Sequence, residues 1–180
     1  MGYYKVLSAP MSTCMPYYKG LYRSEPFPKS DEENRFMALW QHYVQHSEKN
    51  RGITIELTID ELKELASLAT KASSDSYEVI YFSDSLECPH QSEYYGVDVA
   101  GYGGYSMVGE NFFKDSIKNG IYYMYDVINH YFRAKLNSYG LFNRLEDAIS
   151  FRMVLNDLTA LSSSSIEQED RYIVHIYKII

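Results

Sequence analysis

A glycine- and tyrosine-rich segment, residues 94–110, constrains the fold of this chain more than any other stretch. It places five glycines and four tyrosines around Asp98. Glycine frees the backbone for tight turns, and tyrosine adds a large apolar ring with a polar tip. Alternating residues on both sides of the glycine turn at 101–104 predict two short strands joined as a hairpin.

A phosphate-binding loop is the alternative for the same glycines. Such a loop needs a glycine run that opens a helix, with a lysine in the loop or a dinucleotide fingerprint. Here Gly109 and Glu110 lead into asparagine and two phenylalanines, and the next lysine is Lys114. The pattern therefore argues against nucleotide binding.

Other β-prone runs accompany this hairpin. They are short, bounded by polar or proline breaks, and rich in β-branched and aromatic residues. Together with the hairpin they predict a sheet of about five strands. The runs are residues 3–7, 53–57, 77–82 and 172–180.

Helices are predicted where apolar residues recur at helical spacing behind a capping signal. Ser30 with Glu33 and Thr58 with Glu61 both have the capping-box spacing, and each precedes an amphipathic stretch. A third helix is expected after Asp115, ending at Gly140, and a fourth from about residue 145. The sequence thus predicts an α+β fold over a single domain, residues 1–180. It has two layers, with about four helices mainly on one face of a mostly antiparallel sheet.

The tyrosine content and the net charge indicate which classes of partner the protein could bind. The chain has 19 tyrosines and 8 phenylalanines and a formal net charge of −7. Excess tyrosine favours a protein-binding surface, and acidic charge favours a basic partner. Nucleic acid is disfavoured because no lysine and arginine cluster is present, and no window approaches the ~20 apolar residues of a membrane span. Solubility alone also explains the charge.

Cysteines and histidines give no complete site. Cys14 and Cys88 form no disulfide framework and the N-terminus has no signal-peptide core, so we expect reduced thiols in the cytoplasm. His90 follows Cys88 closely, but a structural loop is favoured over a nucleophile or zinc site. His42 and His46 lie one helical turn apart without a third ligand. No cofactor, metal or catalytic residue is predicted.

Two segments carry a resemblance to a protein family. Residues 95–106 contain a Gly-x-Asp strand followed by a glycine turn, and residues 136–148 read LNSYGLFNRLEDA. In both, the chain resembles small bacterial immunity proteins of contact-dependent and polymorphic toxin systems. The resemblance implies a cytoplasmic inhibitor that binds and neutralises a cognate toxin domain, with no catalysis of its own. The motifs are structural, so they carry over no functional residues.

Candidate partner-binding residues come from the glycine- and tyrosine-rich segment, because rigid aromatic rings with an acidic rim suit a tight, electrostatically steered complex. Each residue also has a structural explanation, as a turn cap or a ring covering the sheet. The candidates are Tyr94, Tyr95, Asp98, Tyr102, Tyr105 and Glu110.

Two other functions stay open. One is a small-molecule binder or enzyme with its pocket at the turn 101–110, in which Asp98 or Glu110 acts as acid or base with His90 or Cys88 as helper. The other is a structural or oligomerising domain, such as a homodimer in which the strand 172–180 pairs with its copy at a sheet edge.

Overall fold

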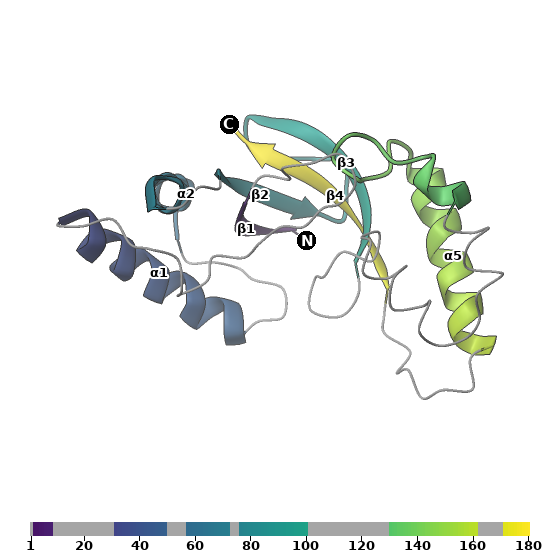
Figure 1. Ribbon diagram of the computed structural model, residues 1–180, viewed down its shortest axis with the longest axis horizontal. Coiled ribbons are helices and arrows are strands. Elements are labelled where there is room, and N and C mark those ends of the chain that lie inside the picture. Colours follow the sequence, from purple (N-terminus) through teal and green to yellow (C-terminus); the bar gives the residue numbers. More distant parts are fainter. Residues whose placement is uncertain (1, 9–30, 50–56, 73–75, 101–129, 162–170) are drawn as a thin grey trace. The chain divides into compact units, whose positions relative to one another are not determined.

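Four strands form one open antiparallel sheet in the computed structural model, which describes residues 2–8, 31–49, 57–72, 76–100, 130–161 and 171–180 (Figure 1). The strand order is β1-β2-β4-β3. The α+β class and the antiparallel sheet are confirmed. The described sheet has four strands rather than about five, and the expected strand 53–57 and the turn at 101–104 lie outside the described residues. The strands are β1 (Gly2–Ser8), β2 (Tyr77–Ser83), β3 (Ser92–Ala100) and β4 (Tyr172–Ile179).

Three helices have described bounds: α1 (Asp31–Lys49), α2 (Ile59–Ala72) and α5 (Leu145–Leu161). The predicted capping box opens α2. The Glu61 N–H donates to Thr58 Oγ1 at 3.2 Å, and the Thr58 N–H donates to Glu61 Oε2 at 2.9 Å. Two amides that the first helical turn leaves without a partner are thereby satisfied.

The chain divides into two compact units, and each is described by itself. The first comprises Met1–Met11, Tyr17–Tyr94 and Ile176–Ile180, and the second comprises Ser12–Pro16 and Tyr95–His175. β1, β2, α1 and α2 belong to the first unit, and α5 belongs to the second. β3 and β4 are each divided between the units: β3 enters the second unit after Tyr94, and β4 enters the first unit at Ile176.

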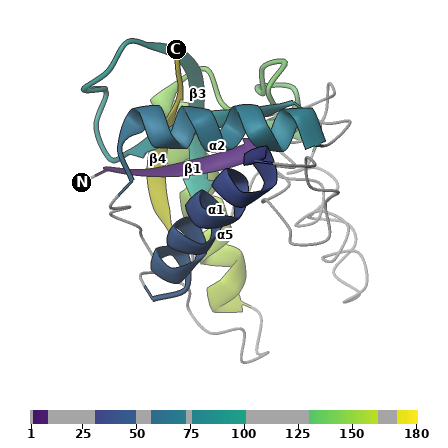
Figure 2. The ribbon, with the colours of Figure 1, turned by 90° about the vertical axis from the view of Figure 1, so that its left-hand side faces the viewer.

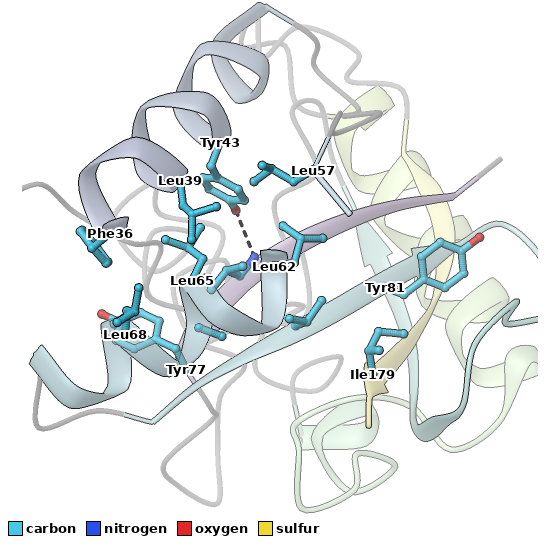
Figure 3. Packing of buried hydrophobic residues seen from close by; sticks show 14 of the residues in the cluster. Phe36, Leu39, Tyr43, Leu57, Leu62, Leu65, Leu68, Tyr77, Tyr81 and Ile179 are labelled. Atoms are coloured by element: carbon cyan, nitrogen blue, oxygen red, sulfur yellow. Dashed lines mark hydrogen bonds between the residues drawn. The ribbon is translucent and has the colours of Figure 1, made fainter. Parts of the chain in front are cut away.

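In the first unit, α2 packs on β1 and β2, and α1 packs on α2 (Figure 2). The amphipathic stretch expected after Ser30 predicts a buried stripe of Phe36, Leu39, Trp40, Tyr43 and Val44. Phe36, Leu39 and Tyr43 are buried and Trp40 is half-buried, whereas the side chain of Val44 lies outside the described part. The buried residues of α1 meet Leu62 and Leu65 of α2, which are fully buried (Figure 3). Burying each of these side chains stabilises the fold by about 1.5–3 kcal/mol before the entropy of ordering it is subtracted.

In the second unit, three phenylalanine rings form the centre of the core. Phe132 meets Phe151 at a centroid distance of 5.0 Å, and Phe142 meets Phe151 at 5.5 Å. Val97 and Val99 of β3 complete the cluster with Ala148 and Leu155 of α5. Edge-on ring geometry at these distances adds to the burial energy.

Main-chain groups of both outer strands form hydrogen bonds outside the sheet. The Val6 N–H of β1 donates to the Tyr43 hydroxyl at 3.1 Å. In β3, the Val97 N–H donates to the Phe142 carbonyl at 2.8 Å, and the Phe142 N–H donates back to the Val97 carbonyl at 2.9 Å. Unpaired strand edges promote association, so these contacts protect the sheet.

The C-terminal strand does not lie where edge pairing would need it. β4 is an inner strand, flanked by β2 and β3. The expectation that strand 172–180 pairs with its own copy at a sheet edge is therefore wrong, because both of its sides already carry strands. Across the described helices, none is long and apolar enough to cross a membrane.

Candidate binding surface

The structure places three of the six candidate partner-binding residues, all in β3. Tyr94 is 42% exposed, whereas Tyr95 and Asp98 are 5% and 1% exposed. Tyr102, Tyr105 and Glu110 lie outside the described residues, as does the pocket proposed at residues 101–110. Of the three placed residues, only Tyr94 presents a surface that a partner could contact.

Tyr95 and Asp98 are held inside the fold by their own contacts. The Tyr95 ring stacks on Tyr139 with a centroid distance of 4.1 Å and an interplanar angle of 14°. Asp98 Oδ1 accepts a hydrogen bond from the Val99 N–H at 2.7 Å. A buried carboxylate needs such partners, so Asp98 serves the backbone of β3 in this structure.

The described part of the first motif, residues 95–100, packs against the second motif, residues 136–148. Gly96 has φ +142°, and a Cβ added there would lie 2.8 Å from the Phe142 carbonyl oxygen and 2.9 Å from Leu141 Cβ. Only glycine allows this approach. Gly96 and residues 141–142 are more than 40 positions apart in the sequence, and they pack against each other in the structure.

Asn137 stabilises this contact between β3 and residues 137–142. Its Nδ2 donates to the Tyr95 carbonyl at 2.7 Å, and its Oδ1 accepts from the N–H groups of Tyr139 at 2.9 Å and Leu141 at 3.2 Å. Asparagine side chains commonly fix loops by this type of hydrogen bond. The amide thus joins the turn after residue 136 to β3.

The helix expected to end at Gly140 ends earlier. Its last helical residue is Arg133, and the chain then enters a turn in which Leu136 bridges to Phe142. Gly140 has φ 71° inside the loop instead of at the helix end. The bridge and the Asn137 hydrogen bonds replace the further helical turns.

Tyr94 belongs to a cluster of four tyrosines in the first unit. Its ring lies 5.1 Å from that of Tyr177 on β4, the Tyr177 ring lies 6.3 Å from Tyr81 on β2, and Tyr81 lies 4.8 Å from Tyr4 on β1. Tyr81 and Tyr177 are 9% and 6% exposed. The half-exposed Tyr94 ring therefore packs on the buried Tyr177 ring, which contacts the buried Tyr81 ring, and Tyr81 in turn contacts the half-buried Tyr4 ring.

His90 and Cys88 join the same cluster. The Tyr4 hydroxyl and His90 Nε2 share a hydrogen bond of 2.6 Å. Cys88 is a free thiol, half-buried, and packs against the core from which these rings come. The sequence favoured a structural loop for these two residues, and their packing in the structure is of that kind.

The raised pKa values of these tyrosines make them poor general bases. Burial, and then the neighbouring Tyr177, raise the pKa of Tyr94 to about 12. Burial also raises the pKa of Tyr4 and of Tyr177 above the usual tyrosine value. Their hydroxyls stay protonated near neutral pH, whereas a general base works best with a pKa near the operating pH.

The β2–β3 connection beside the cluster is acidic. The connection, residues 84–91, contains Asp84 and Glu87 and no lysine or arginine, and Glu93 follows at the start of β3. Asp84 and Glu87 are exposed.

Two other places on the protein carry polar side chains without forming a site. A shallow groove between α1 and α2 is lined by charged side chains, but these pair with each other: Arg35 with Glu64 at 2.6 Å and Lys71 with Glu32 at 2.7 Å. No group of three metal-binding side chains occurs among the residues with described positions. His175 is buried in β4, as expected for a packed histidine, and burial lowers its pKa.

Comparison of this chain with protein-family models, with curated proteins and with solved structures gave no match. The site therefore has to be judged on its own geometry.

Sequence reasoning missed Tyr4, Tyr81 and Tyr177 as neighbours of Tyr94. A signal was available, since Tyr4 and Tyr81 are direct cross-strand partners in the β1–β2 register. Cross-strand aromatic pairs are a common unit of sheet packing, but the register becomes known only when the strands are paired.

Proposed function

We propose that this protein is a cytoplasmic immunity-type protein that binds and neutralises a cognate bacterial toxin domain, without catalysis of its own. Three features support the proposal. Residues 95–106 and 136–148 resemble immunity proteins, the net charge of −7 suits a basic toxin, and the surface carries a supported tyrosine anchor.

The observation that carries the proposal is the position of Tyr94. Its ring is 42% exposed, and the face turned inward packs on Tyr177 at 5.1 Å. Residues that dominate binding energy in protein complexes are often aromatic side chains of this kind, held rigidly before the partner arrives. A preorganised ring loses little conformational entropy on binding.

Calorimetry with a defined partner tests the function. The partner to test is any C-terminal toxin domain encoded beside the gene for this chain, purified in a catalytically inactive form. We expect a complex with equal amounts of both proteins, together with protection of cells that express the active toxin domain. Absence of both binding and protection would exclude the immunity function.

The candidates outside the described residues are tested in the same assay. If Tyr102 and Tyr105 are part of the interface, changing both to alanine weakens binding by at least ~2 kcal/mol. An affinity unchanged by both substitutions would remove these two residues from the interface and leave Tyr94 as the candidate anchor.

A further inference from the structure

A phenol and an imidazole are hydrogen-bonded to each other in the first unit. The Tyr4 hydroxyl of β1 and His90 Nε2, from the β2–β3 connection, are 2.6 Å apart, and the centroids of the two rings are 5.7 Å apart. Both side chains are half-buried. In the tautomer that carries its proton on Nδ1, the imidazole accepts the phenolic hydrogen at Nε2. A base is thus in direct contact with the oxygen of this tyrosine.

Tyr4 is also the last ring of a row that begins at the surface. The Tyr94 ring lies 5.1 Å from Tyr177, Tyr177 lies 6.3 Å from Tyr81, and Tyr81 lies 4.8 Å from Tyr4. Tyr94 is 42% exposed, whereas the two middle rings are buried. We call Tyr94, Tyr177, Tyr81 and Tyr4 the tyrosine row. It connects an exposed phenol to the phenol that contacts His90.

Tyrosine is one of the side chains that one-electron oxidants attack, and rings in contact exchange single electrons rapidly. An oxidised phenol that keeps its proton is a cation, and a charge inside the protein carries a large desolvation cost. A base on the hydroxyl removes this cost by taking the proton, which leaves a neutral radical. The oxidised state of a tyrosine is therefore most stable where a base contacts its oxygen.

Two members of the tyrosine row differ clearly in this respect. The Tyr177 hydroxyl is buried and has no hydrogen-bond partner among the described residues, so its proton has no acceptor there. The Tyr4 hydroxyl has His90. Burial, and then the neighbouring Tyr81 and Cys88, raise the pKa of Tyr4, so this phenol still carries the proton to be transferred near neutral pH. An electron vacancy in the row is thus more stable on Tyr4 than on Tyr177.

We propose that the Tyr4–His90 pair is a site of reversible one-electron oxidation, reached from Tyr94 through the tyrosine row. An oxidant that accepts one electron takes it from Tyr4 and is itself reduced. The Tyr4 O–H bond breaks, and its proton forms an N–H bond with His90 Nε2. The products are a neutral Tyr4 phenoxyl radical and the His90 imidazolium, and an electron from a reductant reverses both changes. This activity goes beyond toxin binding and does not depend on it.

Stopped-flow oxidation by hexachloroiridate(IV) tests the site. This ion accepts one electron, becomes hexachloroiridate(III) and loses its colour. We expect a fast phase in which each protein molecule loses a single electron and forms a phenoxyl radical, detected by EPR after rapid freezing. The fast phase should be slower in heavy water, because a proton moves with the electron.

Matched tyrosine substitutions locate the oxidised ring. Tyr4→Phe keeps the ring and removes the oxidisable hydroxyl, so we expect it to lose the fast phase. Tyr131→Phe should keep the fast phase, because Tyr131 is 57% exposed but belongs to the second unit, outside the tyrosine row. A fast phase that persists in Tyr4→Phe overturns the proposal.

His90→Gln separates proton transfer from hydrogen bonding. The glutamine side-chain oxygen can accept a hydrogen bond from Tyr4, but an amide is too weak a base to take the proton. Because a positioned base contributes ~100-fold or more to a rate, we expect the fast phase to slow by ~100-fold. Urea unfolding of each variant checks that the fold is retained. A folded His90→Gln protein with an unchanged fast phase also overturns the proposal.

Cys88 is the alternative resting place for the oxidation, since its half-buried thiol packs against the same cluster. Cys88→Ser should keep both the fast phase and the phenoxyl signal. A radical that disappears in Cys88→Ser and persists in Tyr4→Phe lies on sulfur and overturns the assignment to Tyr4.

The route through the row is tested at its exposed end. Tyr94→Phe removes the hydroxyl of the ring that meets the oxidant and should slow the fast phase. An unchanged rate in this variant would remove the row from the proposal. Binding of a toxin domain plays no part in these measurements, so their outcome is separate from that of the immunity function.

Discussion

The hydroxyl of Tyr43 in α1 accepts a hydrogen bond from the Val6 N–H at 3.1 Å, across 37 positions of sequence. Both groups are buried. The bond satisfies an outward-facing amide of β1 with a side chain instead of another strand. Helix α1 is thereby tied directly to a strand, although its main packing is against α2.

Removing this hydroxyl should destabilise the protein. In Tyr43→Phe the Val6 N–H stays buried without its acceptor, which costs about 1–3 kcal/mol. The free energy of unfolding in urea measures the loss. Tyr177→Phe is the matched control, because its buried hydroxyl has no hydrogen-bond partner among the described residues. We expect that control to be as stable as the unaltered protein or more so.

Alkaline pH should also weaken the fold through Tyr43. Burial raises its pKa from 10.0 to about 12, the hydrogen bond from Val6 acting weakly in the other direction. Between these values the unfolded chain releases the proton while the folded protein retains it, so stability is full below pH 10 and falls as pH rises toward 12. Urea midpoints across this range should fall more steeply for the unaltered protein than for Tyr43→Phe. Parallel curves would contradict the assignment to Tyr43.

Asn137 should be a sensitive position of the second unit. Asn137→Ala removes the donor to the Tyr95 carbonyl and the acceptor for the amides of Tyr139 and Leu141, so we expect a loss of about 2–4 kcal/mol. Asn137→Asp keeps the acceptor and loses the donor. Its free energy of unfolding in urea should lie between those of the unaltered protein and Asn137→Ala. Equal losses for both variants would mean that the turn amides do not depend on this side chain.

Gly96 and Gly140, the glycines with positive φ in the part of the chain that the structure describes, should differ in their tolerance of a side chain. Gly96→Ala puts Cβ 2.8 Å from the Phe142 carbonyl at φ +142°, so strain and crowding should cost about 3 kcal/mol or more. Gly140→Ala, at φ 71°, should cost about 1–2 kcal/mol. Thermal unfolding of both variants gives the comparison. A Gly140 variant weaker than the Gly96 variant would contradict the packing described for Phe142.

Local patterns in the sequence predicted the elements that depend on nearby residues. The capping box of Thr58 and Glu61, the stripe of Phe36, Leu39 and Tyr43, and the strands β1, β2 and β4 all rest on short-range spacing, and the structure confirms them. The predicted helix end at Gly140 was wrong: the last helical residue is Arg133, and Leu136 and Val97 instead form β-bridges with Phe142.

The candidate site was less accessible to sequence reasoning. Tyr94 and Tyr95 are neighbours with the same side chain, yet one is half-exposed and the other is covered by Tyr139. Which face of β3 is buried depends on residues that are distant in the sequence, such as Tyr139. The stacking of Tyr94 on Tyr177 depends in the same way on strand order, which no local pattern encodes.

The hydrogen-bonded main-chain groups on the two outer strands have a consequence for self-association of the protein. Tyr43 fills a bonding position on β1, and Phe142 fills one on β3. A β-strand of another molecule would find these main-chain groups already hydrogen-bonded, so strand addition is disfavoured at these positions. The contacts of Tyr43 and Phe142 should therefore let the protein stay dispersed at a higher concentration than a sheet with open edges would.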